Sequence, residues 1–146
     1  MAKKEKAKIP EPISNAFLDS YLETCLWSST DESNEQGGDP LDQNYSVEDF
    51  SDEALAKAVK DCNAFIKRAE KLMDEAVEIK KRAGKVIPDD NQHGHDFWLT
   101  RNRHGAGFWD RGYGAVGDKL TEIAQSFGEQ YAIVGDDGKI HLEGGR

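Results

Sequence analysis

Residues 92–114 bring together most of the side chains in this chain that could do chemistry. His93, His95 and His104 lie there with Asp96 and Asp110, and imidazole and carboxylate groups are ligands that zinc and other transition metals accept. The spacing of these residues matches no established metal motif, because neither an HExxH pattern nor a pair of closely spaced cysteines accompanies them. The histidines are therefore candidate metal ligands, with hydrogen bonding inside a turn as the alternative.

Catalysis is a second interpretation of the same stretch. His104 could act as a base oriented by Asp96 or Asp110, with Thr100 as the available nucleophile. No serine or cysteine stands in a recognisable elbow, and residues 105–107 lack the Lys-Ser/Thr ending of a phosphate-binding loop. The sequence therefore assigns no catalytic residue, and we expect no cofactor.

Binding is the third interpretation, because the stretch also interleaves cations with aromatic rings. Trp, Tyr and Arg dominate the hot spots of protein interfaces, whereas single-stranded nucleic acid is held by cations beside stacking rings. Five glycines between 105 and 117 indicate tight turns, so a purely structural role is the alternative. The candidate binding residues are Trp98, Arg101, Arg103, His104, Trp109 and Arg111.

The charge distribution disfavours one class of partner. The chain of 146 residues has a net charge of −9, and residues 11–56 hold twelve acidic residues and no Lys or Arg. Such a field disfavours duplex nucleic acid, whose binding depends on neutralising phosphates. The acidic residues of this region could instead form a surface that binds a basic partner. The oligomeric state stays open.

The remaining composition describes the expected setting of the protein. We predict a disordered basic tail over residues 1–10, with neither a secretory signal nor a membrane-spanning run. Cys25 and Cys62 lie within helical patterns, which favours buried thiols over a disulfide or a metal pair. These features suggest a reducing, cytoplasmic setting.

Two helices are predicted in the N-terminal half. The first runs from Ser14 to Ser28 and carries apolar residues at three- and four-residue spacing. Residues 29–46 show no apolar period and contain Gly and Pro, so they should form an exposed acidic loop. The second helix starts at a Ser51 cap, carries one wide apolar stripe and stops at Gly84. At about 1.5 Å per residue it spans roughly 45 Å, so one end could project.

The C-terminal half is predicted to form a small antiparallel sheet with one packed helix. Residues 96–100 and 107–110 are expected to be partner strands, followed by a helix over 117–128. Residues 131–134 and 139–142 flank a Gly-Asp-Asp-Gly turn that is typical of a hairpin. The predicted fold is a single α+β domain over residues 11–146.

The segment Asp96–Gly112, DFWLTRNRHGAGFWDRG, resembles a signature found in small proteins of tailed bacteriophages and prophages. The similarity extends to Leu26–Ser29, Tyr45–Phe50, Gly117–Leu120 and Gly135–Gly138. It implies a phage or prophage origin, but no particular activity and no catalytic residue.

We therefore expect a non-enzymatic small acidic protein that binds a host or phage macromolecule, with a protein as its partner. It could modulate host defence or nucleic-acid metabolism. The alternative is binding of single-stranded nucleic acid or a nucleotide, or a small enzyme, through the loop formed by residues 93–113.

Overall fold

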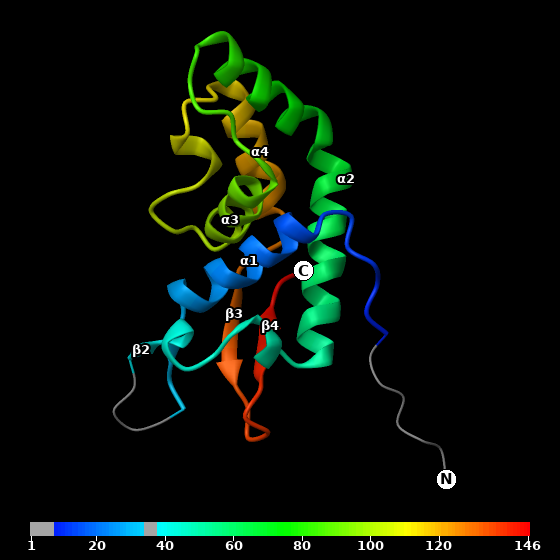
Figure 1. The fold of residues 1–146 in the computed structure, drawn as a ribbon, viewed down its shortest axis with the longest axis vertical. Helices are drawn as coiled ribbons and strands as arrows, with labels where there is room; N and C mark the ends of the chain where they lie inside the picture. The colour runs from blue at the N-terminus through cyan, green and yellow to red at the C-terminus, as the bar shows by residue number, and fades with distance from the viewer. Residues whose placement is uncertain (1–7, 34–37) are drawn as a thin grey trace.

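The computed structural model describes residues 8–33 and 38–146 and combines helices with short antiparallel ladders. Helices α1 and α2 cross each other, α3 and α4 pack beside them, and the C-terminal hairpin lies against both of the first two helices (Figure 1). The elements of the described residues are α1 (Asn15–Ser28), β1 (Thr30–Asp31), β2 (Asp39–Pro40), η1 (Leu41–Gln43), η2 (Val47–Asp49), α2 (Asp52–Arg82), α3 (Asp90–Arg101), η3 (Phe108–Asp110), α4 (Ala115–Gln125), β3 (Gln130–Val134) and β4 (Ile140–Gly144).

The two N-terminal helices form as the sequence predicted. The Ser14 hydroxyl accepts a hydrogen bond from a backbone N–H of the first turn of α1, and the Ser51 hydroxyl does the same for α2. Such caps satisfy backbone donors that the helix itself leaves without partners. The predicted stop is also confirmed, because Gly84 follows α2 with a φ of +66°, a conformation that glycine adopts without strain.

The hairpin of β3 and β4 is confirmed as well. Its register pairs Val134 with Ile140 and Gln130 with Gly144. The outer edge of β4 is partly covered, because Ile140 forms a parallel bridge with Phe50 and its carbonyl accepts the N–H of Ser51. Strand β4 therefore lies between β3 and the N-terminal part of α2 (Figure 1).

The prediction of two strands, at residues 96–100 and 107–110, is wrong. The first segment belongs to α3 and the second forms the 3₁₀ turn η3. Every residue from 96 to 101 is buried. A helix that is surrounded on all sides has no polar face, so the apolar stripe that identifies an amphipathic helix is missing from its sequence.

Two further boundaries differ from the predictions. Helix α4 begins at Ala115, two residues before the expected start, and ends at Gln125, shortly before Gly128 with its φ of +79°. The predicted acidic loop 29–46 contains the short β1–β2 ladder, and it buries the side chain of Leu41. Residues 34–37 of that loop, like residues 1–7 of the predicted tail, lie outside the described residues.

An aromatic core joins the helices. The rings of Phe65 on α2 and Phe97 on α3 stack with their centroids 4.3 Å apart, and Phe65 also stacks on Phe108. Helix α3 packs closely on α1, because Gly94 faces the backbone of Phe17 with no room for a side chain. Buried aromatic pairs in offset or tilted contact add stability beyond their area. This core holds residues 92–114 in place.

Cys25 and Cys62 are buried free thiols, as predicted. Burial raises the pKa of Cys25 to about 12 and raises that of Cys62 well above its usual value, so neither thiol is a ready nucleophile. Among residues 8–33 and 38–146, no helix has both the length and the hydrophobicity that crossing a bilayer requires.

Candidate binding site

Arg101 is the central buried group of the 92–114 stretch, with only 1% of its surface exposed. Its guanidinium donates to a carboxylate oxygen of Asp61 (2.8 Å), to the hydroxyl of Tyr21 (2.9 Å) and to the carbonyls of Phe127 and Gly128 (2.9 Å each). Burial opposes the charge, but Tyr21 and Asp61 outweigh it, so the pKa of Arg101 lies above its ordinary value. Arg101 thus ties four separate segments together as a permanent cation.

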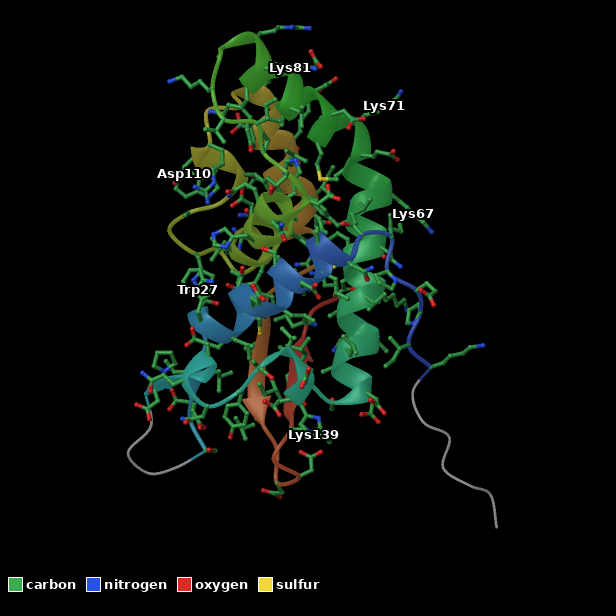
Figure 2. The ribbon with its side chains drawn as sticks, viewed as in Figure 1. Trp27, Lys67, Lys71, Lys81, Asp110 and Lys139 are labelled. Atoms are coloured by element: carbon green, nitrogen blue, oxygen red, sulfur yellow. The ribbon has the colours of Figure 1, made fainter. Side chains whose placement is uncertain are left out.

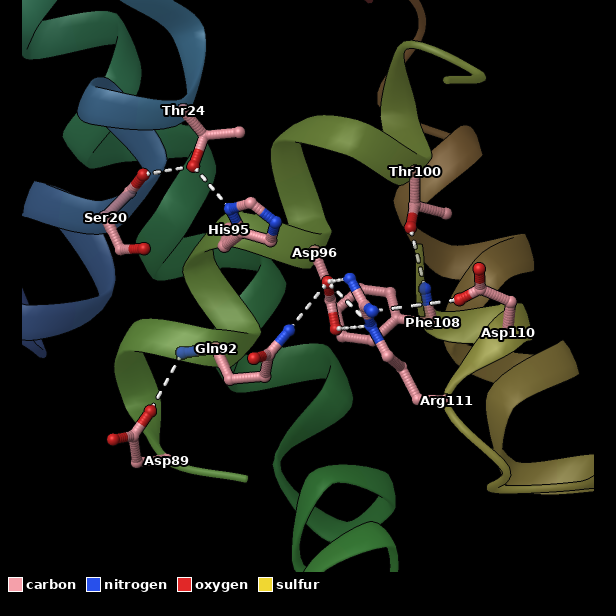
Figure 3. Close-up of polar contacts among 10 residues, drawn as sticks. All are labelled: Ser20, Thr24, Asp89, Gln92, His95, Asp96, Thr100, Phe108, Asp110 and Arg111. Atoms are coloured by element: carbon pink, nitrogen blue, oxygen red, sulfur yellow. Dashed lines mark hydrogen bonds and ion pairs between the residues drawn. The ribbon is translucent and has the colours of Figure 1, made fainter. Parts of the chain in front are cut away.

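Asp96 and Arg111 form a second internal link, which Figure 3 shows in close-up. Arg111 donates hydrogen bonds to the fully buried Asp96 carboxylate from Nε (3.2 Å) and Nη2 (2.8 Å), and Gln92 donates to the same carboxylate (3.1 Å). The hydrogen bond to Asp96 is the main cause that raises the pKa of Arg111. The pair fixes the turn that follows η3 to the middle of α3.

Trp98 and Thr100 are also turned inward. The indole N–H of Trp98 donates to the Ser28 hydroxyl at 2.9 Å, and Trp98 is 1% exposed. The Thr100 hydroxyl accepts the backbone N–H of Phe108 at 3.1 Å (Figure 3). Trp98 and Arg101, two of the candidate binding residues, are therefore buried parts of the interior and do not lie on an outer face.

The three histidines of the stretch lie in different surroundings. His93 is buried, and its Nδ1 has no hydrogen-bond partner within the described chain. His95 stacks on Trp27, and its Nδ1 lies 3.0 Å from the Thr24 hydroxyl. Because that hydroxyl already donates to a carbonyl of α1 (Figure 3), Nδ1 of His95 must carry the proton. Burial is the main cause that lowers the pKa of both His93 and His95. His104 is exposed.

These positions do not assemble the proposed metal or catalytic sets. In the described part of the chain, no group of three or more His, Cys, Asp or Glu side chains is placed to hold a metal ion. The carboxylate of Asp96 is engaged by Arg111 and Gln92, while Asp110 lies 3.9 Å from the Arg111 guanidinium. Neither carboxylate forms a hydrogen bond with His104.

Three of the candidate binding residues are exposed, and a fourth is partly exposed. Arg103 and His104 are exposed in the loop after α3, and Trp109 is 49% exposed on η3. Arg103 has a φ of +56°, which is uncommon for a residue with a side chain. Arg111 is partly exposed, since 29% of its side chain reaches solvent beside Asp96.

A groove lies between β3 and the end of α1. It has a volume of about 580 Å³, within the range of roughly 300–1,000 Å³ that is typical of ligand sites. Trp98 and His104 of the 92–114 stretch contribute to its wall. The groove residues are Ser28, Ser29, Thr30, Glu32, Ser33, Trp98, Asn102, His104, Glu129, Gln130, Tyr131, Ala132, Ile133 and Val134.

Two features distinguish this groove from ordinary surface. Tyr131 and Ile133 leave 58% and 43% of their surfaces exposed, although both are large apolar residues of a strand. Adjacent exposed apolar residues beside a concave surface are typical of interaction sites. The charged side chains that line the groove are Glu32 and Glu129, and no Lys or Arg of the described residues accompanies them.

Sequence reasoning named Trp98 and His104 but missed the rest of the groove. The run Tyr131–Val134 contains no polar residue, so its sequence shows no alternation that would separate an outer face of β3 from an inner one. Figure 2 shows Asp110 of η3 at the outside of the molecule. Trp27 lies at the C-terminal end of α1, next to the groove residue Ser28 in the chain.

The chain matches no known family model, no curated protein and no solved structure.

Proposed function

We propose that this chain is a non-enzymatic binding protein that holds a segment of a partner protein in the groove beside β3. The supporting observation is the combination of a groove of about 580 Å³ with the exposed side chains of Tyr131 and Ile133 at its border. Trp98 stiffens the wall, because its ring is locked by the bond to Ser28. A rigid, partly apolar groove loses little entropy when a partner enters it.

The proposed surface is narrower than the six residues singled out in the sequence. Arg101 and Trp98 are committed to the interior, and Arg111 is committed to Asp96. His104 is the exposed member of that set that lines the groove. The 92–114 stretch therefore contributes to binding mainly by holding the groove in shape.

The two alternatives find less support in the geometry. A nucleic-acid surface needs available cations, yet Arg101 and Arg111 are paired with carboxylates. Among the described residues this leaves Arg103 as the one arginine of the candidate set without an ion pair. An enzyme using Thr100 or Asp96 would need groups that are already bound, because both take part in internal hydrogen bonds.

The biological setting belongs to the same proposal. The resemblance of Asp96–Gly112 to a phage and prophage signature suggests that the partner is a host or phage protein in the host cytoplasm. Modulation of host defence or of nucleic-acid metabolism is the form of activity that we propose for such a binder.

Site-specific photocrosslinking tests this proposal. A photoreactive amino acid at Ile133, in the groove, should yield a discrete adduct with one bacterial protein. The matched control is Lys71 on α2, which is exposed and points away from α1 (Figure 2), and it should yield none. Adducts from Lys71 but not from Ile133, or no adduct from either position, would refute the proposed function.

A further inference from the structure

We infer that the occupant of the groove is an extended, Lys- or Arg-bearing polypeptide segment that adds to β3 as a third strand. This inference rests on the proposed function and specifies how the partner is held. Its basis is the backbone of β3, whose edge facing away from β4 carries hydrogen-bonding groups that have no partner among the described residues at Ala132 and Val134.

The register of the hairpin shows which groups point to that edge. Gly135 donates to the Lys139 carbonyl, and Gly145 donates to the Glu129 carbonyl, so these two cross-strand bonds bracket β3. In an antiparallel pair the backbone groups of alternate residues face the partner strand. Tyr131 and Ile133 therefore bond to β4, and the residues between them face away from it.

The outward set consists of Gln130, Ala132 and Val134. The N–H of Gln130 confirms the direction, because it leaves the hairpin and donates to the Asn102 side chain at 2.7 Å. Ala132 and Val134 have no backbone hydrogen bond outside the hairpin within the described residues. Both of them line the groove, so their N–H and C=O groups are available to an added strand.

The edge also lacks the features that normally prevent strand addition. Natural edge strands are protected by charged side chains, proline or bulges. β3 has the sequence Gln-Tyr-Ala-Ile-Val, with no charge and no proline, and it pairs with β4 without a bulge. Peptide recognition by strand addition uses an edge of this kind, with backbone bonds supplying affinity and side-chain pockets supplying specificity.

Charge selects the kind of segment. Glu32 and Glu129 line the groove, and the whole chain carries −9. Pairing two copies of this edge would bring like charges together, which costs free energy. A segment with Lys or Arg would instead be attracted. If every second residue of the added segment is basic, its cations lie on the same face of the sheet as Tyr131. The apolar residues between them then point into the groove toward Trp98.

The test uses a fluorescent six-residue peptide of alternating lysine and valine. N-methylation removes a backbone donor without changing side-chain charge, and only one of the two alternate sets of peptide N–H groups can face β3. Methylating one set should weaken binding at least tenfold, and methylating the other set should leave it nearly unchanged. Replacing lysine with glutamate should abolish binding. Equal effects of the two sets, or no binding at about 1 mM peptide, would overturn the inference.

Protein variants provide an independent check. Ala132→Pro removes an outward N–H, and edge positions tolerate proline, so the variant should fold and bind the peptide at least tenfold more weakly. Ala132→Ser keeps the N–H and is the matched control. If Ala132→Pro fails to fold, amide exchange replaces it: the peptide should slow exchange at Ala132 and Val134 but leave Tyr131 and Ile133 unchanged.

The outcomes separate the two proposals. If the peptide shows no strand-like pattern while the crosslink at Ile133 still forms, strand addition is wrong and groove binding stands. If the crosslink fails as well, both are wrong.

Discussion

The replacement Arg101→Met should be among the most damaging single substitutions in this protein. Methionine keeps much of the buried volume but removes all four hydrogen bonds that the guanidinium donates. The carbonyl of Gly128 then loses the donor that the guanidinium supplied, and the carbonyl of Phe127 keeps only the N–H of Arg146. Asp61 loses its counter-charge. A buried group that is left unsatisfied costs its full desolvation free energy.

The magnitude follows from what remains after the substitution. Removing one partner of a buried ion pair costs about 3–5 kcal/mol. The Asp61 side chain is 18% exposed, so water can reach part of its carboxylate and relieve some of that cost. We therefore expect a loss near the lower end, about 3 kcal/mol, in the free energy of unfolding. The double variant Arg101→Met with Asp61→Asn should be less unstable than additivity of the two single changes predicts.

Urea denaturation followed by circular dichroism measures these changes. Arg103→Met is the matched control, because Arg103 lies two residues away, is exposed and forms no ion pair with any described residue. It should change the free energy of unfolding by no more than about 0.5 kcal/mol. A loss below about 1 kcal/mol for Arg101→Met would refute the reasoning, since the guanidinium would then not be a structural tie.

Three further predictions concern the same scaffold. Gly94→Ala should lower the free energy of unfolding by at least about 2 kcal/mol, because the new Cβ would press on the backbone of α1. The control Gly105→Ala has open space around it, so thermal melting should show almost no change in its stability. Burial lowers the pKa of His93 below 6.5 in the folded state, so the unfolded chain is protonated first as pH falls. Stability should therefore decline below about pH 7, by at most about 1.4 kcal/mol per pH unit. In urea titrations, His93→Leu should show a smaller decline; an equal decline would contradict this account. Trp98→Phe should lose about 1–3 kcal/mol through its lost hydrogen bond and the cavity, and Trp109→Phe, at an exposed site, should lose less than 0.5 kcal/mol by the same titration.

Helices α1 and α2 and the C-terminal hairpin could be predicted because their residue patterns are local and regular. α1 and α2 each bury one face, so their apolar residues recur at helical spacing and their serine caps mark the start. The hairpin was predictable because its Asp-Gly turn adopts a positive φ at Gly138. These are local properties of the chain, which is why the sequence was sufficient.

Helix α3 was missed because its surroundings, and not its own sequence, decide its periodicity. Residues 96–101 are all buried, and the short apolar run Phe97–Leu99 within them is equally compatible with a buried strand. A usable signal did exist at the start of the helix. Asp89 follows Pro88, and its side chain caps the N–H of Gln92 (Figure 3), a pattern that favours a helix beginning at that point.

The groove could not be predicted, because it joins segments about 100 residues apart. Nothing in the sequence indicates that Thr30 and Val134 line the same groove. Their common position depends on how α3 holds the end of α1, through the hydrogen bond from Trp98 to Ser28. The sequence shows that rings and cations are concentrated at 92–114. Their inward orientation depends on partners such as Asp61 and Tyr21, which lie far from them in the chain.

The central claim is that the 92–114 stretch builds the fold while the groove beside β3 meets the partner. NMR mapping of backbone amide shifts, on adding the partner that crosslinks to Ile133, tests this most directly. The largest changes should appear at Thr30, His104, Ala132 and Val134. Changes concentrated at Trp109 and along α2, with the amides of β3 unmoved, would contradict it.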